Sequence, residues 1–280
     1  PIWFRQQILY LKRHYQIVRF EDDWTTLERD GVCITFDDGY RDNLEYALPV
    51  LEELEVPATI FVSTGTMEPS GELWWDELER WMLTGDRVPA YFKLEDEEFG
   101  CRWDTDTWEH RRNCHHALFF LMKNFITPGR REAWLAQLAL WRGNGREPRR
   151  SNLTVSREDC RRLSASKMIS IGAHTVSHSS LATLDREMQE REIRMSVERL
   201  SEIIEERIRL FSYPFGNPEI DFTEETIEIC RKCGIQKAAS TEYSLWESST
   251  DPYRIPRKVA RDWDFGEFGR QIREYWEGRG

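Results

Sequence analysis

The chain has 280 residues, of which 40% are hydrophobic and 12% aromatic, enough to fill a core and to exclude disorder as the dominant state. Its 39 basic and 50 acidic residues give a net charge of −11, which argues against nucleic acid as the main partner. No stretch reaches the roughly 20 consecutive apolar residues of a transmembrane segment. The length fits either two domains or one large α/β barrel.

The chain begins Pro1-Ile2-Trp3-Phe4 without an initiator methionine. We therefore expect that N-terminal residues have been removed, and a signal or anchor could have been removed with them. We expect a soluble protein, and the sequence leaves the bacterial cytoplasm and the cell envelope equally open. Six cysteines are too few for a disulfide scaffold at this length. Cys230 and Cys233 close an amphipathic segment, and we expect them to pack in a helix.

Helical and buried-strand patterns alternate along the chain. An amphipathic segment at 4–15 predicts a helix, and the apolar run Gly31-Val-Cys-Ile-Thr-Phe36 predicts a buried strand. A helix at 43–54 and a strand at 57–62 complete a βαβ unit. The order resumes with predicted helices at 156–163, 185–207, 223–233 and 268–276 and strands at 168–171, 210–213 and 236–239. This alternation predicts an α/β fold with a parallel sheet, open or closed into a barrel.

Residues 66–151 interrupt the alternation. They contain helical patterns at 75–83, 108–125 and 130–141 and a polar loop at 143–150. We interpret them as a largely helical insertion in a single domain that spans 1–280. Its Trp74-Trp75-Asp76 cluster fits a stacking platform for sugar rings and equally well the core of the insertion. The charged segment 185–207 is expected to be a solvated outer helix.

Two carboxylates and two imidazoles follow predicted strands. Asp37 and Asp38 lie at the carboxyl end of the strand 31–36, where ligand sites form in parallel α/β proteins, and Gly39 permits a tight turn. His174 and His178 follow a second strand, four residues apart, a spacing that lets both reach one ion. Each pair alone also fits a plain turn or a cap.

Taken together, one carboxylate and two imidazoles form an incomplete metal shell with positions open for water or substrate. This donor set suits Zn²⁺, and Co²⁺, Mn²⁺ and Fe²⁺ also fit. The second carboxylate is then free to accept a proton from a metal-activated water, as a general base does.

Several ordered segments carry a family resemblance: Thr35-Phe-Asp-Asp-Gly39, Pro57-Ala-Thr-Ile-Phe-Val62, His174-Thr-Val-Ser-His178 and Phe211-Ser-Tyr-Pro-Phe-Gly216. In these the chain resembles the polysaccharide deacetylase family with the NodB homology domain, carbohydrate esterase family 4, over about 31–263 outside the insertion. The resemblance implies a distorted (β/α) barrel and metal-dependent hydrolysis of the N-acetyl group of an amino sugar in a glycan, oligosaccharide or lipid-linked sugar.

The resemblance also implies roles for individual residues. Asp37 matches the general base that activates the metal-bound water, and the backbone N–H of Phe215 matches an oxyanion donor. Trp263 matches a wall of the acetyl pocket. The remaining matches are the metal ligands Asp38, His174 and His178, and the sugar-groove residues Tyr213, Pro214 and Phe215.

Three departures from the family pattern leave questions open. Ser212 stands where an arginine often pairs with the base, and Arg257 and Arg261 are candidate replacements. Val259 replaces an aspartate of the motif that ends at Trp263. No histidine follows His178, so the general acid is sought among His14, His115, His116, Asp37 after it gains a proton, and a residue of the missing N-terminus.

These departures keep two alternatives to N-deacetylation in view. One is an N-deformylase of a formamido sugar, which needs only a tighter acyl pocket. The other is a carbohydrate-binding pseudoenzyme that retains the metal. The free carboxylate of Asp37 argues against the pseudoenzyme, because binding alone has no use for a base.

Overall fold

The computed structural model describes residues 2–69, 71–85, 88–143 and 147–278. The chain forms two compact units, the first from Pro1–Glu68 with Val155–Gly280 and the second from Pro69–Thr154. Part of the polar loop predicted at 143–150 lies outside the described residues. Within the described part of the chain, no helix combines the length and apolar character needed to cross a bilayer.

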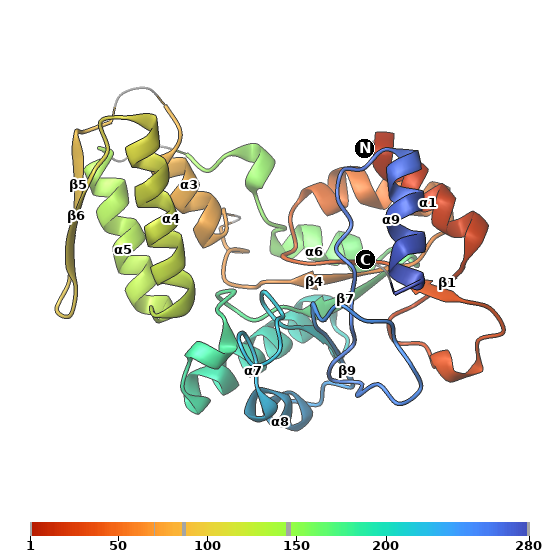
Figure 1. Cartoon of the computed structure of the whole chain (residues 1–280). Helices are drawn as coiled ribbons and strands as arrows, with labels where there is room; N and C mark the ends of the chain where they lie inside the picture. Colours follow the sequence, from red (N-terminus) through yellow and green to blue (C-terminus); the bar gives the residue numbers. More distant parts are fainter. Residues whose placement is uncertain (1, 70, 86–87, 144–146, 279–280) are drawn as a thin grey trace. The chain divides into compact units, whose positions relative to one another are not determined.

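The first unit alternates strands and helices close to the positions that the sequence predicts (Figure 1). A π-helical turn over Asn43–Ala47 precedes α2. The elements are α1 (Ile2–His14), β1 (Gln16–Val18), β2 (Gly31–Cys33), β3 (Thr35–Phe36), α2 (Leu48–Glu53), β4 (Ala58–Val62), α6 (Arg157–Ser164), β7 (Ile169–Ala173), α7 (Arg186–Ile204), β8 (Leu210–Ser212), α8 (Glu224–Lys232), β9 (Lys237–Ala239) and α9 (Phe265–Trp276).

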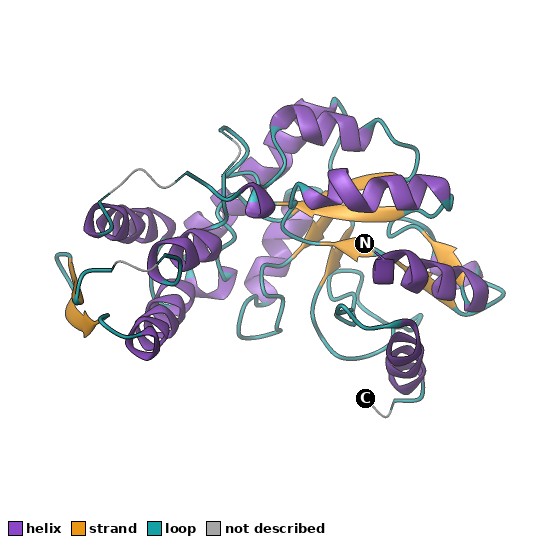
Figure 2. Cartoon of the chain, turned by 90° about the horizontal axis from the view of Figure 1, so that it is seen from above, coloured by secondary structure: helices purple, strands orange, loops and turns teal. Residues whose placement is uncertain are grey.

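The main sheet has five parallel strands in the order β3-β4-β7-β8-β9, and Figure 2 shows helices packed around these strands. The predicted α/β fold with a parallel sheet is therefore confirmed. The strand predicted at 31–36 is divided at Ile34, and its first half, β2, pairs in parallel with β1. β1 was not predicted, because three residues are too few to show a periodicity.

Both faces of the sheet are buried, which is why its strands are continuous apolar runs rather than alternating ones. Along β4, Ile60 and Val62 face the cluster formed with the helices, and Phe61 faces a second cluster that includes Phe20 and Trp24. Gly172 in β7 makes room for Phe61, because a Cβ there would lie 2.4 Å from its ring. Large side chains therefore cover both faces of the sheet.

The second unit combines helices with an antiparallel hairpin. Its elements are α3 (Trp74–Met82), β5 (Tyr91–Glu95), β6 (Gly100–Asp104), α4 (Trp108–Asn124) and α5 (Pro128–Trp141). The sequence predicted the helices and missed the hairpin, although Phe92 and Leu94 are buried between exposed neighbours, the pattern of a half-buried strand. Trp74 is 6% exposed and its ring lies 5.1 Å from that of Phe119, so it packs in the core of this unit.

The cysteine pair also packs in a core. Cys230 is fully buried within α8, and all six cysteines are free thiols. The prediction of ordinary helix packing is confirmed for Cys230.

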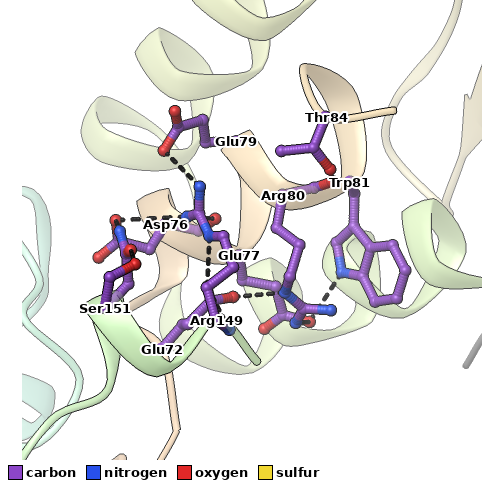
Figure 3. Close-up of polar contacts among 10 residues, drawn as sticks. Glu72, Asp76, Glu77, Glu79, Arg80, Trp81, Thr84, Arg149 and Ser151 are labelled. Atoms are coloured by element: carbon purple, nitrogen blue, oxygen red, sulfur yellow. Dashed lines mark hydrogen bonds and ion pairs between the residues drawn. The ribbon is translucent and has the colours of Figure 1, made fainter. Parts of the chain in front are cut away.

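A buried ion-pair network joins the entry and exit of the second unit (Figure 3). The side chain of Glu72 is 1% exposed and pairs with Arg80 and, at 2.7 Å, with Arg149. Arg149 also reaches Glu79 at 3.0 Å and the carbonyl of Asp76 at 2.8 Å. Charges taken out of water this completely are tolerated only when they are paired. Glu72 therefore fastens the returning segment to the start of α3.

Replacing Glu72 by Gln removes the buried carboxylate that Arg80 and Arg149 share. We expect Glu72→Gln to lower the free energy of unfolding by about 3–5 kcal/mol, measured by denaturant unfolding. Glu53→Gln is the matched control, because Glu53 pairs with Arg5 at 2.6 Å in a half-exposed position and should change stability little. Equal effects of the two substitutions would contradict a special role for the buried network.

Candidate metal centre

The carboxyl ends of three parallel strands bring the predicted site residues together. Asp37 and Asp38 follow β3, His174 follows β7, and Ser212 ends β8. Parallel strands end at the same edge of a sheet, so residues far apart in sequence meet there. Asp38 and His174 meet in this way across 174 − 38 = 136 positions.

The three predicted ligands converge on one point. Asp38 Oδ1 lies 3.4 Å from His174 Nε2 and 3.1 Å from His178 Nε2. One donor atom of each residue lies within 4.8 Å of the others. Both imidazoles are almost fully buried, at 1% and 4% exposure. Electron-rich donors gathered this closely fit a divalent cation between them, and the set of one carboxylate and two imidazoles agrees with such a site.

The orientation of His174 is fixed from behind. Its Nδ1 lies 2.7 Å from the backbone carbonyl of Ser212, an acceptor that requires a proton on Nδ1. The lone pair of the neutral ring is therefore on Nε2, which faces Asp38. Such an outer contact sets the tautomer and the direction of a ligating imidazole.

The segment from His174 to His178 is held in an irregular conformation. Thr175 and His178 have φ values of 64° and 51°, the left-handed region that costs energy for residues with a side chain. The backbone N–H of His178 donates to Thr175 Oγ1 at 3.0 Å. Glu192, on α7, accepts from the N–H groups of Val176 and Ser177 at 3.0 and 2.8 Å. These bonds compensate the strain and aim His178 at Asp38.

Glu192 is a functional residue that sequence reasoning missed. The charges of 185–207 predict a solvated outer helix, but Glu192 is 8% exposed and turns inward from α7. The sequence alone does not single out Glu192, because α7 carries several glutamates. Only the position of the loop before His178 shows which of them is buried.

The turn after β3 requires glycine at position 39. Asp38 and Gly39 both have φ of 74°, and a Cβ at Gly39 would lie 2.9 Å from Val62 Cγ1. The sharp turn lets two consecutive carboxylates point into different surroundings.

Asp37 is held by an arginine from the far end of the sheet. Arg257 Nη1 and Nη2 donate to Asp37 Oδ1 and Oδ2, each at 2.8 Å, in a bidentate pair. Nη1 also donates to Thr35 Oγ1 at 3.1 Å, and Nη2 to Ser212 Oγ at 2.9 Å. Arg257 therefore provides the positive charge that Ser212 does not. Arg261, the other candidate, uses its carbonyl to accept from Gln7 at 3.0 Å.

The electrostatics of the two carboxylates follow from these partners. Burial would raise the pKa of Asp37, but the charges of Arg257 and His174 hold it below its usual value. Burial opposes ionisation of Asp38 as well, yet its close contacts with the two imidazoles lower its pKa strongly. The pKa of His174 is raised, because the carboxylates outweigh its burial, whereas burial lowers the pKa of His178.

Phe215 also reaches the centre. Its ring meets that of His178 edge to face at 4.8 Å, and its φ of 62° places the backbone in a tight turn with Gly216. The carbonyl of Phe215 accepts from Thr241 Oγ1 at 2.8 Å. The turn thus fixes the backbone of Phe215 beside a predicted ligand, and Pro214 is buried next to it.

The structure corrects the expectation for Tyr213. Its side chain has no exposed surface, stacks on Phe222 at 3.8 Å and donates to the carbonyl of Tyr253 at 3.0 Å. A ring packed on this hydrophobic core does not wall a sugar groove. Tyr213 instead anchors the turn that carries Phe215.

Trp263 packs beside helices α1 and α9. It packs on the cluster of α1 and α9 that includes Tyr10 and Phe268, and its carbonyl accepts from Gln7 at 2.8 Å. A role of Trp263 as a wall of the acetyl pocket stays a prediction.

The three histidines considered as the general acid have other surroundings. The ring of His14 lies 4.4 Å from that of Tyr10 in α1. His115 and His116 lie on α4 of the second unit and contact each other at 5.8 Å. Burial lowers the pKa of His115.

Comparisons with known proteins agree on one family. The model of the polysaccharide deacetylase family matches residues 25–90 and 110–238, and no curated protein matches the chain. The chain is similar to the Streptococcus pyogenes deacetylase PplD in complex with acetate, with 14% identity, a TM-score of 0.59, and 96% of this chain and 85% of that one covered.

Two further structures support the same fold. IcaB from Ammonifex degensii shares 17% identity with a TM-score of 0.56, over 97% of this chain and 87% of that one. A de-N-acetylase from Aggregatibacter actinomycetemcomitans shares 12% identity with a TM-score of 0.55, over 98% and 87%. At these identities the likeness shows the fold, a curled parallel half-barrel.

The inward position of Glu192 predicts an effect on metal affinity. We expect Glu192→Ala to weaken Zn²⁺ binding by about 10- to 100-fold, measured by calorimetric titration, because the loop between the two imidazoles loses its acceptor. Glu198→Ala is the control, since Glu198 pairs only with solvent-exposed Arg194 at 3.2 Å. Unchanged affinity in Glu192→Ala would show that the loop holds its shape without this contact.

Proposed function

We propose, on the premise that the chain belongs to the polysaccharide deacetylase family, that it hydrolyses the N-acetyl group of an amino sugar in a glycan, oligosaccharide or lipid-linked sugar. The observation that supports this most directly is the placement of Asp37 beside the Asp38–His174–His178 cluster, with a separate cationic partner. We take residues 69–154 as an insertion within one catalytic domain.

Asp38, His174 and His178 are the residues that we assign to the metal. Two neutral imidazoles and one carboxylate suit Zn²⁺ best, with Co²⁺, Mn²⁺ and Fe²⁺ as the other fitting ions. When bound, such an ion supplies Lewis acidity toward the acetyl carbonyl and toward a water molecule.

Asp37 is the proposed general base, and it takes a proton from the attacking water at one of its carboxylate oxygens. The water oxygen then forms a bond to the acetyl carbon, and the C–N bond of the amide breaks. The proton that Asp37 gained passes to the departing nitrogen, so that acetate and a free amine result. In the first unit the only histidine outside the ligand pair is His14, which packs on Tyr10, and we therefore assign both proton transfers to Asp37.

Arg257 keeps Asp37 in place for these transfers. Its bidentate contact fixes the plane of the carboxylate, while its bonds to Thr35 and Ser212 fix the guanidinium. The backbone N–H of Phe215, held in a tight turn next to His178, is the proposed donor to the developing oxyanion. Pro214 and Phe215 are the proposed contacts for the sugar.

The proposal is tested by incubating the metal-loaded protein with N-acetylated glucosamine and galactosamine oligomers and measuring acetate and free amine. We expect Asp37→Asn to lower kcat by about 10²- to 10⁴-fold, and chelation to abolish turnover reversibly. Formate release from N-formyl sugars in place of acetate would select the deformylase. Sugar binding with no turnover across the panel would overturn the enzyme assignment.

A separate set of variants tests the role of Arg257. Arg257→Ala should lower kcat by about 10²-fold, because a freed carboxylate loses its orientation, and Arg257→Lys should recover only part of it, since an ammonium group makes no bidentate contact. Arg254→Ala is the control, because Arg254 pairs with Glu224 and Glu219 at the surface. If kcat is unchanged in Arg257→Ala, Asp37 is positioned by other groups.

A further inference from the structure

The first unit contains an elongated cavity of about 710 Å³ that ends at Asp37. Every residue from Arg29 to Asp37 lines one wall, and Ile255–Ala260 line the opposite wall. Helices α1 and α9, which pack on each other (Figure 1), close its side with Leu11 and Ile272.

The cavity exists because these two walls are not joined as strands. β2 pairs with β1, β3 pairs with β4, and Ile255 forms an isolated bridge with Ala239. Within the described residues, no strand pairing connects 29–37 to 255–260. Arg257 spans the gap at one end only, where it contacts Thr35 and Asp37. We call the space between the two walls the seam slot.

The seam slot is long and apolar. Residues 31–37 of its wall extend over about 20 Å at the usual rise of a strand. Its lining includes large apolar side chains, among them Val18, Phe20, Trp24 and Trp246. The charged residues of the lining are Arg29, Asp30, Asp37, Arg257, Lys258 and Arg261.

The seam slot is larger than the voids found inside packed proteins. Interiors hold few voids larger than a water molecule, and apolar walls without a partner forfeit dispersion contacts. A volume of several hundred Å³ with mainly apolar walls and a few polar groups is typical of a ligand pocket. A sugar ring is a poor occupant, because its hydroxyl groups would lose hydrogen bonds to water there.

We propose that the seam slot binds the hydrocarbon chain of an amphiphilic amino-sugar substrate, with the sugar at the Asp37 end. This inference rests on the proposed function and narrows its substrate class to sugars that carry an apolar chain. Val259, which lines the slot and is 63% exposed, provides an apolar entrance for the chain.

The test compares methyl and octyl N-acetyl-β-D-glucosaminide as probes, both below micelle-forming concentration. Binding is measured with chelator present through the intrinsic fluorescence of the tryptophans, since Trp24, Trp246 and Trp276 line the slot. We expect the octyl glycoside to bind at least about tenfold more tightly than the methyl glycoside, because the added methylenes leave water.

Two substitutions at exposed positions of the slot make the test specific. Ala260→Phe narrows the slot and Val259→Asp places a charge at its entrance, and each should reduce the octyl-to-methyl affinity ratio to about one. Ala165→Phe is the matched control, since Ala165 is exposed at the end of α6, outside the slot, and should keep the ratio of the unaltered protein. Two slot variants guard against a folding defect in one of them, and circular dichroism checks both.

The outcomes separate this inference from the proposed function. Equal binding of the two glycosides, with acetate still released when metal is present, overturns the slot and leaves the deacetylase standing. Chain-dependent binding that both slot variants lose supports the slot, even if no sugar is deacetylated, in which case the proposed function fails. A preference for octyl that survives in both variants places the chain elsewhere and overturns the slot.

Discussion

The arrangement of the site depends on keeping two consecutive carboxylates ionised at the end of β3. Asp37 and Asp38 repel each other, and burial penalises both. Each therefore needs its own compensation: Arg257 for Asp37, and two imidazoles for Asp38. The need for separate partners explains why residues from β3, from the loop after β7 and from the segment after β9 must meet at one edge of the sheet.

Meeting at that edge strains the backbone. Asp38, Thr175, His178 and Phe215 all have left-handed φ values, and such residues persist only where surrounding contacts overdetermine them. Two of these contacts come from neighbouring segments. Glu192 accepts a hydrogen bond from the loop before His178, and Thr241 donates one to the carbonyl of Phe215. The strain is concentrated at the residues that carry the proposed chemistry, while the strands below them are regular.

The same rule governs the second unit, where no chemistry is assigned. Glu72 is buried as deeply as the imidazoles, and two arginines neutralise it. There the paired charges fasten one segment to another. At the candidate metal centre the partners of Asp38 are two imidazoles, whose Nε2 atoms lie 3.4 Å (His174) and 3.1 Å (His178) from its Oδ1. Buried charge thus has a structural role in one unit and a proposed catalytic role in the other.

The fold class followed from the sequence, because buried parallel strands are continuous apolar runs and the helices between them are amphipathic. Sequence periodicity did not reveal β1 or the hairpin of β5 and β6, which are short elements stabilised by their neighbours rather than by local pattern. The hairpin shows the clearest case, since its alternation at Phe92 and Leu94 is meaningful only beside the helices that cover it.

The sequence by itself determined the candidate ligands and base, because Asp37-Asp38-Gly39 and His174-x-x-x-His178 combine residue types and spacing that suit a metal and a base. Only the tertiary structure decided between Arg257 and Arg261, buried the side chain of Tyr213 in the core, and turned Glu192 toward the histidine loop. The physical reason is the sequence separation of the residues that interact. A turn or a four-residue spacing is encoded locally, whereas the partner of a buried charge is set by which distant strand ends beside it.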